Sequence, residues 1–185
     1  MKGTMHWTAG TYKPNNDDRT KYHGGITWNP KTGLPDFEKW HNFTKPLSHT
    51  WEDNTANIGI ALCGMMGAEP GNFGQYPIQK TMVELLVEVC ARISVLKNFN
   101  AFQWLTHAER AALANPPYGI NSGDPETKWD LSILTPLSGG KKLTPKMANE
   151  TGKELRKLIG ARIEELKKEL PQDLLSLELT KAVKS

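Results

Sequence analysis

Apolar and polar residues along the first third of the chain follow the pattern of short strands. Residues 2–8 form one strand pattern, and residues 22–29 form a second that ends in the turn residues Asn-Pro-Lys-Thr-Gly. Residues 37–46 are a weaker extended region, and the polar stretch 12–18 carries turn chemistry typical of a loop. Residues 57–64 are apolar between glycine and polar residues, which indicates a strand buried in the middle of a sheet.

Apolar residues recur at three-and-four spacing farther along, which indicates helices. Residues 82–96 carry the clearest such stripe, and we expect this face to pack on the sheet. A short strand at 102–106 precedes a short helix at 108–114, which two following prolines end. Residues 118–131 are a loop rich in glycine and aspartate. The order of strands and helices predicts an α/β protein.

A final helix is expected near the C-terminus. Thr151 and Glu154 have the spacing of a capping box, so we place the start of this helix at Thr151, with an earlier start at Thr144-Pro145 as the alternative. Pro171 is predicted to end the helix, and residues 173–185 are a short appended element or a tail. We therefore divide the chain into residues 1–143 and a C-terminal helix and tail, 144–185, packed on or appended to the same domain.

Length and charge exclude several classes of protein. A chain of 185 residues with 38% hydrophobic residues suits one domain with an adequate core. The formal net charge of +3 is mild and dispersed, so no nucleic-acid partner is expected, although a basic surface favours an anionic polymer such as a cell wall. We expect neither membrane insertion nor a signal peptide. Cys63 and Cys90 lie in apolar segments and are expected to be buried free thiols.

Two histidines and an aspartate are the most informative candidates for chemistry. His6 lies in the first strand pattern, His107 follows a later one, and Asp130 lies in a Lys-Trp-Asp sequence. Imidazole nitrogens and a carboxylate are the ligands that hold a catalytic zinc on three protein bonds and leave one position for water. Each histidine could instead simply hydrogen-bond in a loop or core.

Several motifs follow one another in a set order. His-Trp-Thr-Ala-Gly occupies residues 6–10, Tyr-His residues 22–23, Asn-x-x-x-Ile-Gly-Ile residues 54–60 and Thr-His residues 106–107. In this order they resemble the zinc-dependent N-acetylmuramoyl-L-alanine amidases, and are most similar to the small phage lysins and related peptidoglycan recognition proteins. The resemblance covers residues 5–131. It implies a central mixed sheet flanked by helices, with the metal in a groove across the sheet, and here an extra C-terminal helix.

The resemblance also implies which residues hold the metal. His6 and His107 match the two histidine ligands of that family. The third ligand there is a carboxylate or thiolate, often two residues after a basic side chain, and Asp130 follows Lys128 at this spacing. Asp124 is the alternative, because an Asp-Pro step commonly follows the last ligand in relatives. No cysteine lies beyond Cys90, so a thiolate is absent.

Other residues are assigned by the same resemblance. Tyr22 and Lys128 match the phage lysins' tyrosine and lysine and are the predicted catalytic groups. The glutamate that some relatives carry on the central strand is replaced by Ala61. His49 is predicted to bind substrate, with Asn54 assisting.

Aromatic residues near these motifs are candidates for substrate contact. Trp7 and Trp129 adjoin the predicted ligands His6 and Asp130 in the sequence, and Trp7 is a predicted substrate-binding residue.

The function that these residues imply is hydrolysis of the amide between N-acetylmuramic acid and L-alanine in bacterial peptidoglycan, with Zn²⁺ as cofactor. We expect a lysin that accumulates in the host cytoplasm before release to the cell wall; the sequence leaves its oligomeric state open. The alternatives are a zinc peptidase that cuts within the stem peptide, a non-catalytic peptidoglycan-binding module, and a wall amidase that uses Cys63 as nucleophile.

Overall fold

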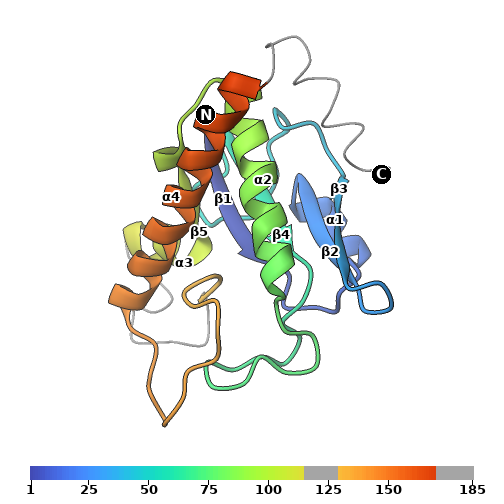
Figure 1. Ribbon diagram of the computed structural model, residues 1–185, viewed down its shortest axis with the longest axis vertical. Helices are drawn as coiled ribbons and strands as arrows, with labels where there is room; N and C mark the ends of the chain where they lie inside the picture. The colour runs from blue at the N-terminus through green and yellow to red at the C-terminus, as the bar shows by residue number, and fades with distance from the viewer. Residues whose placement is uncertain (115–128, 170–185) are drawn as a thin grey trace.

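A five-stranded mixed sheet in the order β3-β2-β4-β1-β5 forms the centre of the protein in the computed structural model (Figure 1). The structure describes residues 1–114 and 129–169. The strands are β1 (Lys2–Trp7), β2 (Gly24–Asn29), β3 (Leu34–Lys39), β4 (Asn57–Leu62) and β5 (Trp104–Thr106). The prediction of an α/β protein with a central mixed sheet flanked by helices is therefore confirmed.

Four of the five strands point the same way. β1 pairs in parallel with β4 and β5, and β2 pairs in parallel with β4, whereas β3 runs antiparallel to β2. The register places His6 opposite Ala61 and Met5 opposite Thr106. The carboxyl ends of β1 and β5 consequently lie side by side at one edge of the sheet, where ligands commonly bind in open α/β folds.

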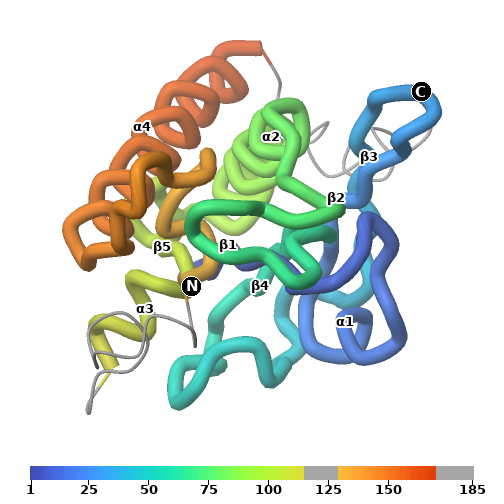
Figure 2. The backbone as a smooth tube through the Cα atoms, turned by 90° about the horizontal axis from the view of Figure 1, so that it is seen from below, coloured from blue at the N-terminus to red at the C-terminus, as the bar shows by residue number. Residues whose placement is uncertain are grey.

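Two long helices cover one face of the sheet. α2 (Lys80–Lys97) and α4 (Pro145–Glu169) lie on one side, and the short helix α1 (Asn16–Lys21) lies on the other (Figure 2). Most of the stripe predicted for residues 82–96 is buried, and it packs with α4 and the sheet in one core. Because neighbouring strand residues point to opposite faces, Met5 and Trp7 join this core while His6 faces the other way.

The start of α4 differs from the preferred prediction and agrees with the alternative one. α4 begins at Pro145, and the Thr144 hydroxyl accepts a hydrogen bond from the Met147 amide at 3.3 Å. Proline suits the first helical position because it needs no amide partner there. Thr151 lies within the helix, and its hydroxyl donates to the Ser132 carbonyl at 2.9 Å. The predicted end at Pro171 and the tail after it lie outside the described residues.

Two segments near the N-terminus were predicted wrongly in part. Residues 12–18 were expected to be a loop, but α1 begins at Asn16 because Asn15 and Asp18 form a capping box. β3 spans Leu34–Lys39, so the extended region lies earlier than the predicted 37–46. It starts directly after Gly33, whose positive φ of 69° closes the turn from β2.

None of the helices within residues 1–114 and 129–169 combines the length and the apolar character that crossing a bilayer requires.

Candidate metal centre

Three segments that are far apart in the sequence meet at the carboxyl edge of the sheet. His6 is the next-to-last residue of β1, and His107 directly follows β5 as the first residue of α3 (His107–Leu113). Asp130 lies in a turn that begins just after the gap in the described residues. The parallel pairing of β1 with β5 brings the two histidines together.

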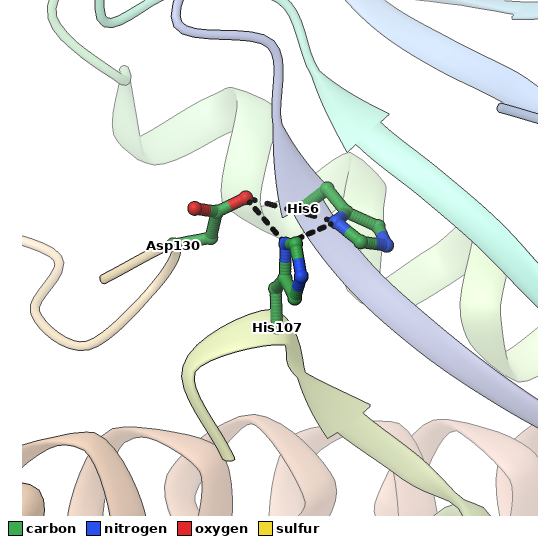
Figure 3. Close-up of side chains that lie close together, drawn as sticks. All are labelled: His6, His107 and Asp130. Atoms are coloured by element: carbon green, nitrogen blue, oxygen red, sulfur yellow. Dashed lines mark hydrogen bonds and ion pairs between the residues drawn. The ribbon is translucent and has the colours of Figure 1, made fainter. Parts of the chain in front are cut away.

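The side chains of His6, His107 and Asp130 point toward one another (Figure 3). His6 Nδ1 lies 3.0 Å from His107 Nδ1, His107 Nδ1 lies 3.2 Å from Asp130 Oδ2, and His6 Nδ1 lies 3.6 Å from the same oxygen. All three residues are buried. Two nitrogens and one oxygen thus form a nearly equilateral triangle.

The distances between these three donor atoms match those around a cation with tetrahedral coordination. Ligand bonds of about 2.0–2.1 Å at tetrahedral angles separate neighbouring donor atoms by about 3.3–3.4 Å. The three observed separations of 3.0, 3.2 and 3.6 Å bracket that value. The group could therefore hold a metal ion with only small adjustments of the side chains.

Burial and mutual contact set the protonation of the group. Burial lowers the pKa of His6 well below its usual value, and neighbouring His107 lowers it further. Burial opposes ionisation of Asp130, but His107 and His6 outweigh it and hold the pKa of this carboxyl well below its usual range. An uncharged His6 and an ionised Asp130 are the protonation states that metal ligands need.

Contacts on both sides fix the turn that carries Asp130. Trp129 packs edge-on against Trp7 with ring centroids 4.5 Å apart, and Leu131 is fully buried at a positive φ of 59°. The Ser132 amide donates to the Trp129 carbonyl at 2.9 Å, and Thr151 of α4 holds the Ser132 carbonyl. The core and α4 together position this carboxylate.

A buried ion pair fixes the start of α3 and thereby His107. Thr106 and Glu109 form a capping box around His107, and Arg156 of α4 donates two hydrogen bonds of 2.8 Å to the Glu109 carboxylate. Gly152 makes this approach possible, because a Cβ there would collide with Glu109. No pattern in the sequence pointed to Arg156. The Thr-x-x-Glu spacing at 106–109 was the available signal for the capping box.

Tyr22 lies beside the candidate metal centre. Its ring centroid is 5.0 Å from that of His6 and 6.4 Å from that of His49. Burial raises the pKa of the phenol, and the charge of Asp130 raises it further, so Tyr22 remains a hydrogen-bond donor over the physiological pH range. The structure therefore places this predicted catalytic residue next to the predicted ligands.

The three predicted substrate-binding residues lie in different surroundings. His49 is buried behind His6, with its Nδ1 3.1 Å from His6 Nε2. Asn54 is half-buried, and its side-chain oxygen accepts hydrogen bonds from the His49 and Thr50 amides at 3.0 and 2.9 Å. Trp7 is part of the hydrophobic core. All three residues therefore make contacts within the protein itself. Direct contact of any of them with a substrate stays a prediction.

Of the remaining candidate residues, the structure describes two and does not describe the other two. Lys128 and the alternative ligand Asp124 lie outside the described residues. Cys63 is fully buried, and burial raises the pKa of its thiol to about 12, so it stays protonated and is a poor nucleophile. Ala61 is buried opposite His6 in the β1–β4 register and offers no acid or base.

The fold and the site together define an α/β protein with a candidate metal centre of two histidines and one aspartate at the carboxyl edge of its sheet. No protein-family model matches this chain, and no curated protein matches it.

Proposed function

We propose that this protein is a zinc-dependent amidase that hydrolyses the bond between N-acetylmuramic acid and L-alanine in peptidoglycan. The observation that carries the proposal is the convergence of His6 Nδ1, His107 Nδ1 and Asp130 Oδ2 within hydrogen-bonding distances at a strand edge. Two imidazole nitrogens with one carboxylate oxygen are a donor set of catalytic zinc sites.

Zinc suits the chemistry of this donor set. Imidazoles favour zinc over magnesium or calcium, which prefer all-oxygen surroundings. When bound on three protein ligands, zinc supplies a Lewis acid and lowers the pKa of a water to about 7. His6, His107 and Asp130 would hold the ion.

The protein's own side chains would assist the reaction beside the metal. Attack on an amide carbonyl builds negative charge on the carbonyl oxygen, and the leaving amine must take up a proton. The neutral phenol of Tyr22, next to His6, is a donor for that oxygen. Lys128, two residues before Asp130, is the second proposed donor.

The substrate rests on the order of motifs along the chain. These motifs resemble those of phage lysins, so we propose peptidoglycan as the partner and the host cytoplasm as the place where the protein accumulates before it reaches the wall. A peptidase that cuts within the stem peptide would use the same metal chemistry. A non-catalytic binding module would not require Tyr22 beside the metal.

Mass analysis of digested peptidoglycan tests the proposal. Zinc-loaded protein is expected to release stem peptides with a free L-alanine amino group, and chelation is expected to abolish this release. Asp130→Ala should lose both zinc and turnover, whereas the matched control Asp124→Ala should keep both. A new amino group within the stem would identify a peptidase. Absence of turnover by zinc-loaded protein would favour a binding module. Unchanged activity after chelation would disprove the metal mechanism.

A further inference from the structure

A chain of hydrogen bonds runs from the backbone of β4 to the side of His6 that faces away from the candidate metal centre. His49 Nε2 lies 3.0 Å from the carbonyl oxygen of Asn57, and His49 Nδ1 lies 3.1 Å from His6 Nε2. His6 is 0% exposed and His49 is 6% exposed, so water does not compete for these bonds. The chain thus joins a fixed backbone group to a predicted metal ligand.

The carbonyl at one end decides which nitrogen of His49 carries the proton. A carbonyl oxygen only accepts hydrogen bonds, so His49 Nε2 must carry a proton. In the neutral ring the other nitrogen, Nδ1, is then an acceptor, and the Thr50 hydroxyl also lies within 2.9 Å of it. His49 Nδ1 thus offers one lone pair, and a His6 Nε2 that donates to it has a bare Nδ1 with its lone pair toward His107 and Asp130.

Two further residues hold His49 in the place that this arrangement requires. Gly59 on β4 leaves room for its ring, because a Cβ at that position would lie 2.7 Å from His49 Cγ. The Asn54 side chain accepts hydrogen bonds from the His49 and Thr50 amides and fixes the backbone on either side. The position of the His49 ring is thus fixed by β4 and by the loop that carries His49 and Asn54.

We propose that His49 is a positioning residue that fixes the tautomer and orientation of His6, so that the His6 Nδ1 lone pair is directed at the metal. This inference rests on the metal-binding part of the proposed function and assigns His49 a role other than contact with substrate. Loss of such an outer partner typically costs about 10–100-fold in metal affinity. The wrong tautomer of His6 would direct a proton at the cation.

Nitrogen NMR of the histidine rings in metal-free, full-length protein tests the tautomer directly. We expect His6 to carry its proton on Nε2 and to have a bare Nδ1, and His49 to show the same pattern. A proton on His6 Nδ1, or protons on both nitrogens of His49 at neutral pH, would overturn the proposal. This measurement needs no His49 variant, so it decides even if a variant fails to fold.

Zinc affinity, measured by competition with a chromophoric chelator, tests the consequence. His49→Leu removes the acceptor and is expected to weaken zinc binding about 10–100-fold. His49→Asn places an amide oxygen near the former Nδ1 and is expected to restore most of that affinity. Equal affinities of both variants, whether reduced or unchanged, would contradict the proposed role.

A second buried histidine provides the matched control. His23 is also fully buried, with its Nε2 2.8 Å from the Lys45 carbonyl, and its ring contacts that of His49 (centroids 5.7 Å apart) but neither predicted ligand ring. His23→Leu keeps both nitrogens of His49, so it should lower stability and weaken zinc binding much less than His49→Leu. If wild-type protein binds no zinc, the proposed function fails, while the nitrogen signals of His6 still decide the direction of the hydrogen bonds.

Discussion

Asp130 is the one negatively charged member of a buried group whose other two members are imidazoles. Its Oδ2 lies 3.2 Å from His107 Nδ1 and 3.6 Å from His6 Nδ1. A carboxylate in this position both neutralises part of a divalent charge and completes the triangle of donors. Its charge, in addition to its shape, would therefore set the affinity for a bound cation.

Asp130→Asn tests this charge with little change in volume. We expect zinc affinity to fall by more than the roughly 10–100-fold that an outer partner contributes, because a direct ligand is lost. Competition with a chelator near neutral pH measures the change, and Asp124→Asn serves as the control. An affinity within a few-fold of wild type would remove Asp130 from the set of ligands.

Tyr22→Phe is expected to separate the proposed metal binding from the proposed catalysis. The phenol lies beside His6 without being one of the three converging ligands, so zinc content is expected to stay unchanged. The turnover number should fall roughly 100-fold or more, which is typical for the loss of one donor to a developing oxyanion or of an acid–base group. A parallel loss of zinc would show that Tyr22 instead supports the fold of the site.

Sequence patterns could predict the residues of the site better than the contacts that support them. His6 and His107 lie in recognisable local contexts, and Asp130 follows a basic residue at the right spacing. Arg156 could not be found in this way, because its partner Glu109 lies 47 residues earlier and only packing of α4 joins them. The hydrogen bond from His6 to His49 depends likewise on tertiary structure.

At the scale of elements, α4 is tied to the site by the Arg156–Glu109 ion pair. Both side chains are largely buried, 11% and 8% exposed, and Arg156 also donates to the Trp104 carbonyl of β5. The pair joins α4 to the strand and helix that flank His107. Removal of one partner would leave the other charge buried without compensation.

Arg156→Ala is expected to lower the free energy of unfolding by about 3–5 kcal/mol, the usual cost of breaking a buried ion pair. Urea denaturation measures this loss. Arg162→Ala is the control on the same helix: its side chain is 25% exposed in an ion-pair network with Glu88, so we expect a loss nearer to 1 kcal/mol. Losses of equal size would mean that the Arg156 pair has no special structural role.

Helices and strands with a clear apolar pattern were predictable from the sequence. Helix starts that depend on a single capping residue were not. The stripe at 82–96 and the apolar run at 57–64 correspond to α2 and β4. The polar residues 15–18 fit both a turn and a helix start, and only the reciprocal bonds between Asn15 and Asp18 decide for α1. The start of α4 at Pro145 similarly depends on which of two threonine caps is used.

Over the whole molecule, buried histidines make stability depend on pH. Burial lowers the pKa of His6 and His23, and lowers that of His49 to about 4. The unfolded chain binds protons at these sites near pH 6.5, before the folded chain does, so stability is full above that pH and is lost as the pH falls. For His49 the full window from about 6.5 to about 4 corresponds to roughly 3 kcal/mol.

Metal-free protein should therefore unfold more readily in urea at about pH 5.5 than at about pH 7.5, and His49 is expected to contribute about 1 kcal/mol of this difference. His49→Asn should remove the part of this difference in the free energy of unfolding that His49 contributes. A free energy of unfolding that is constant between these two pH values would show that the buried rings titrate normally.

The three donors also join β1, near the start of the chain, to the first residue of α3 and to the turn that precedes α4. An ion bound by all three would act as a reversible cross-link that exists only in the native state. It would raise the free energy of unfolding by about 2.7 kcal/mol when the free ion exceeds the dissociation constant a hundredfold. A melting curve recorded against free-ion concentration would accordingly report occupancy, even in the absence of any cell-wall substrate.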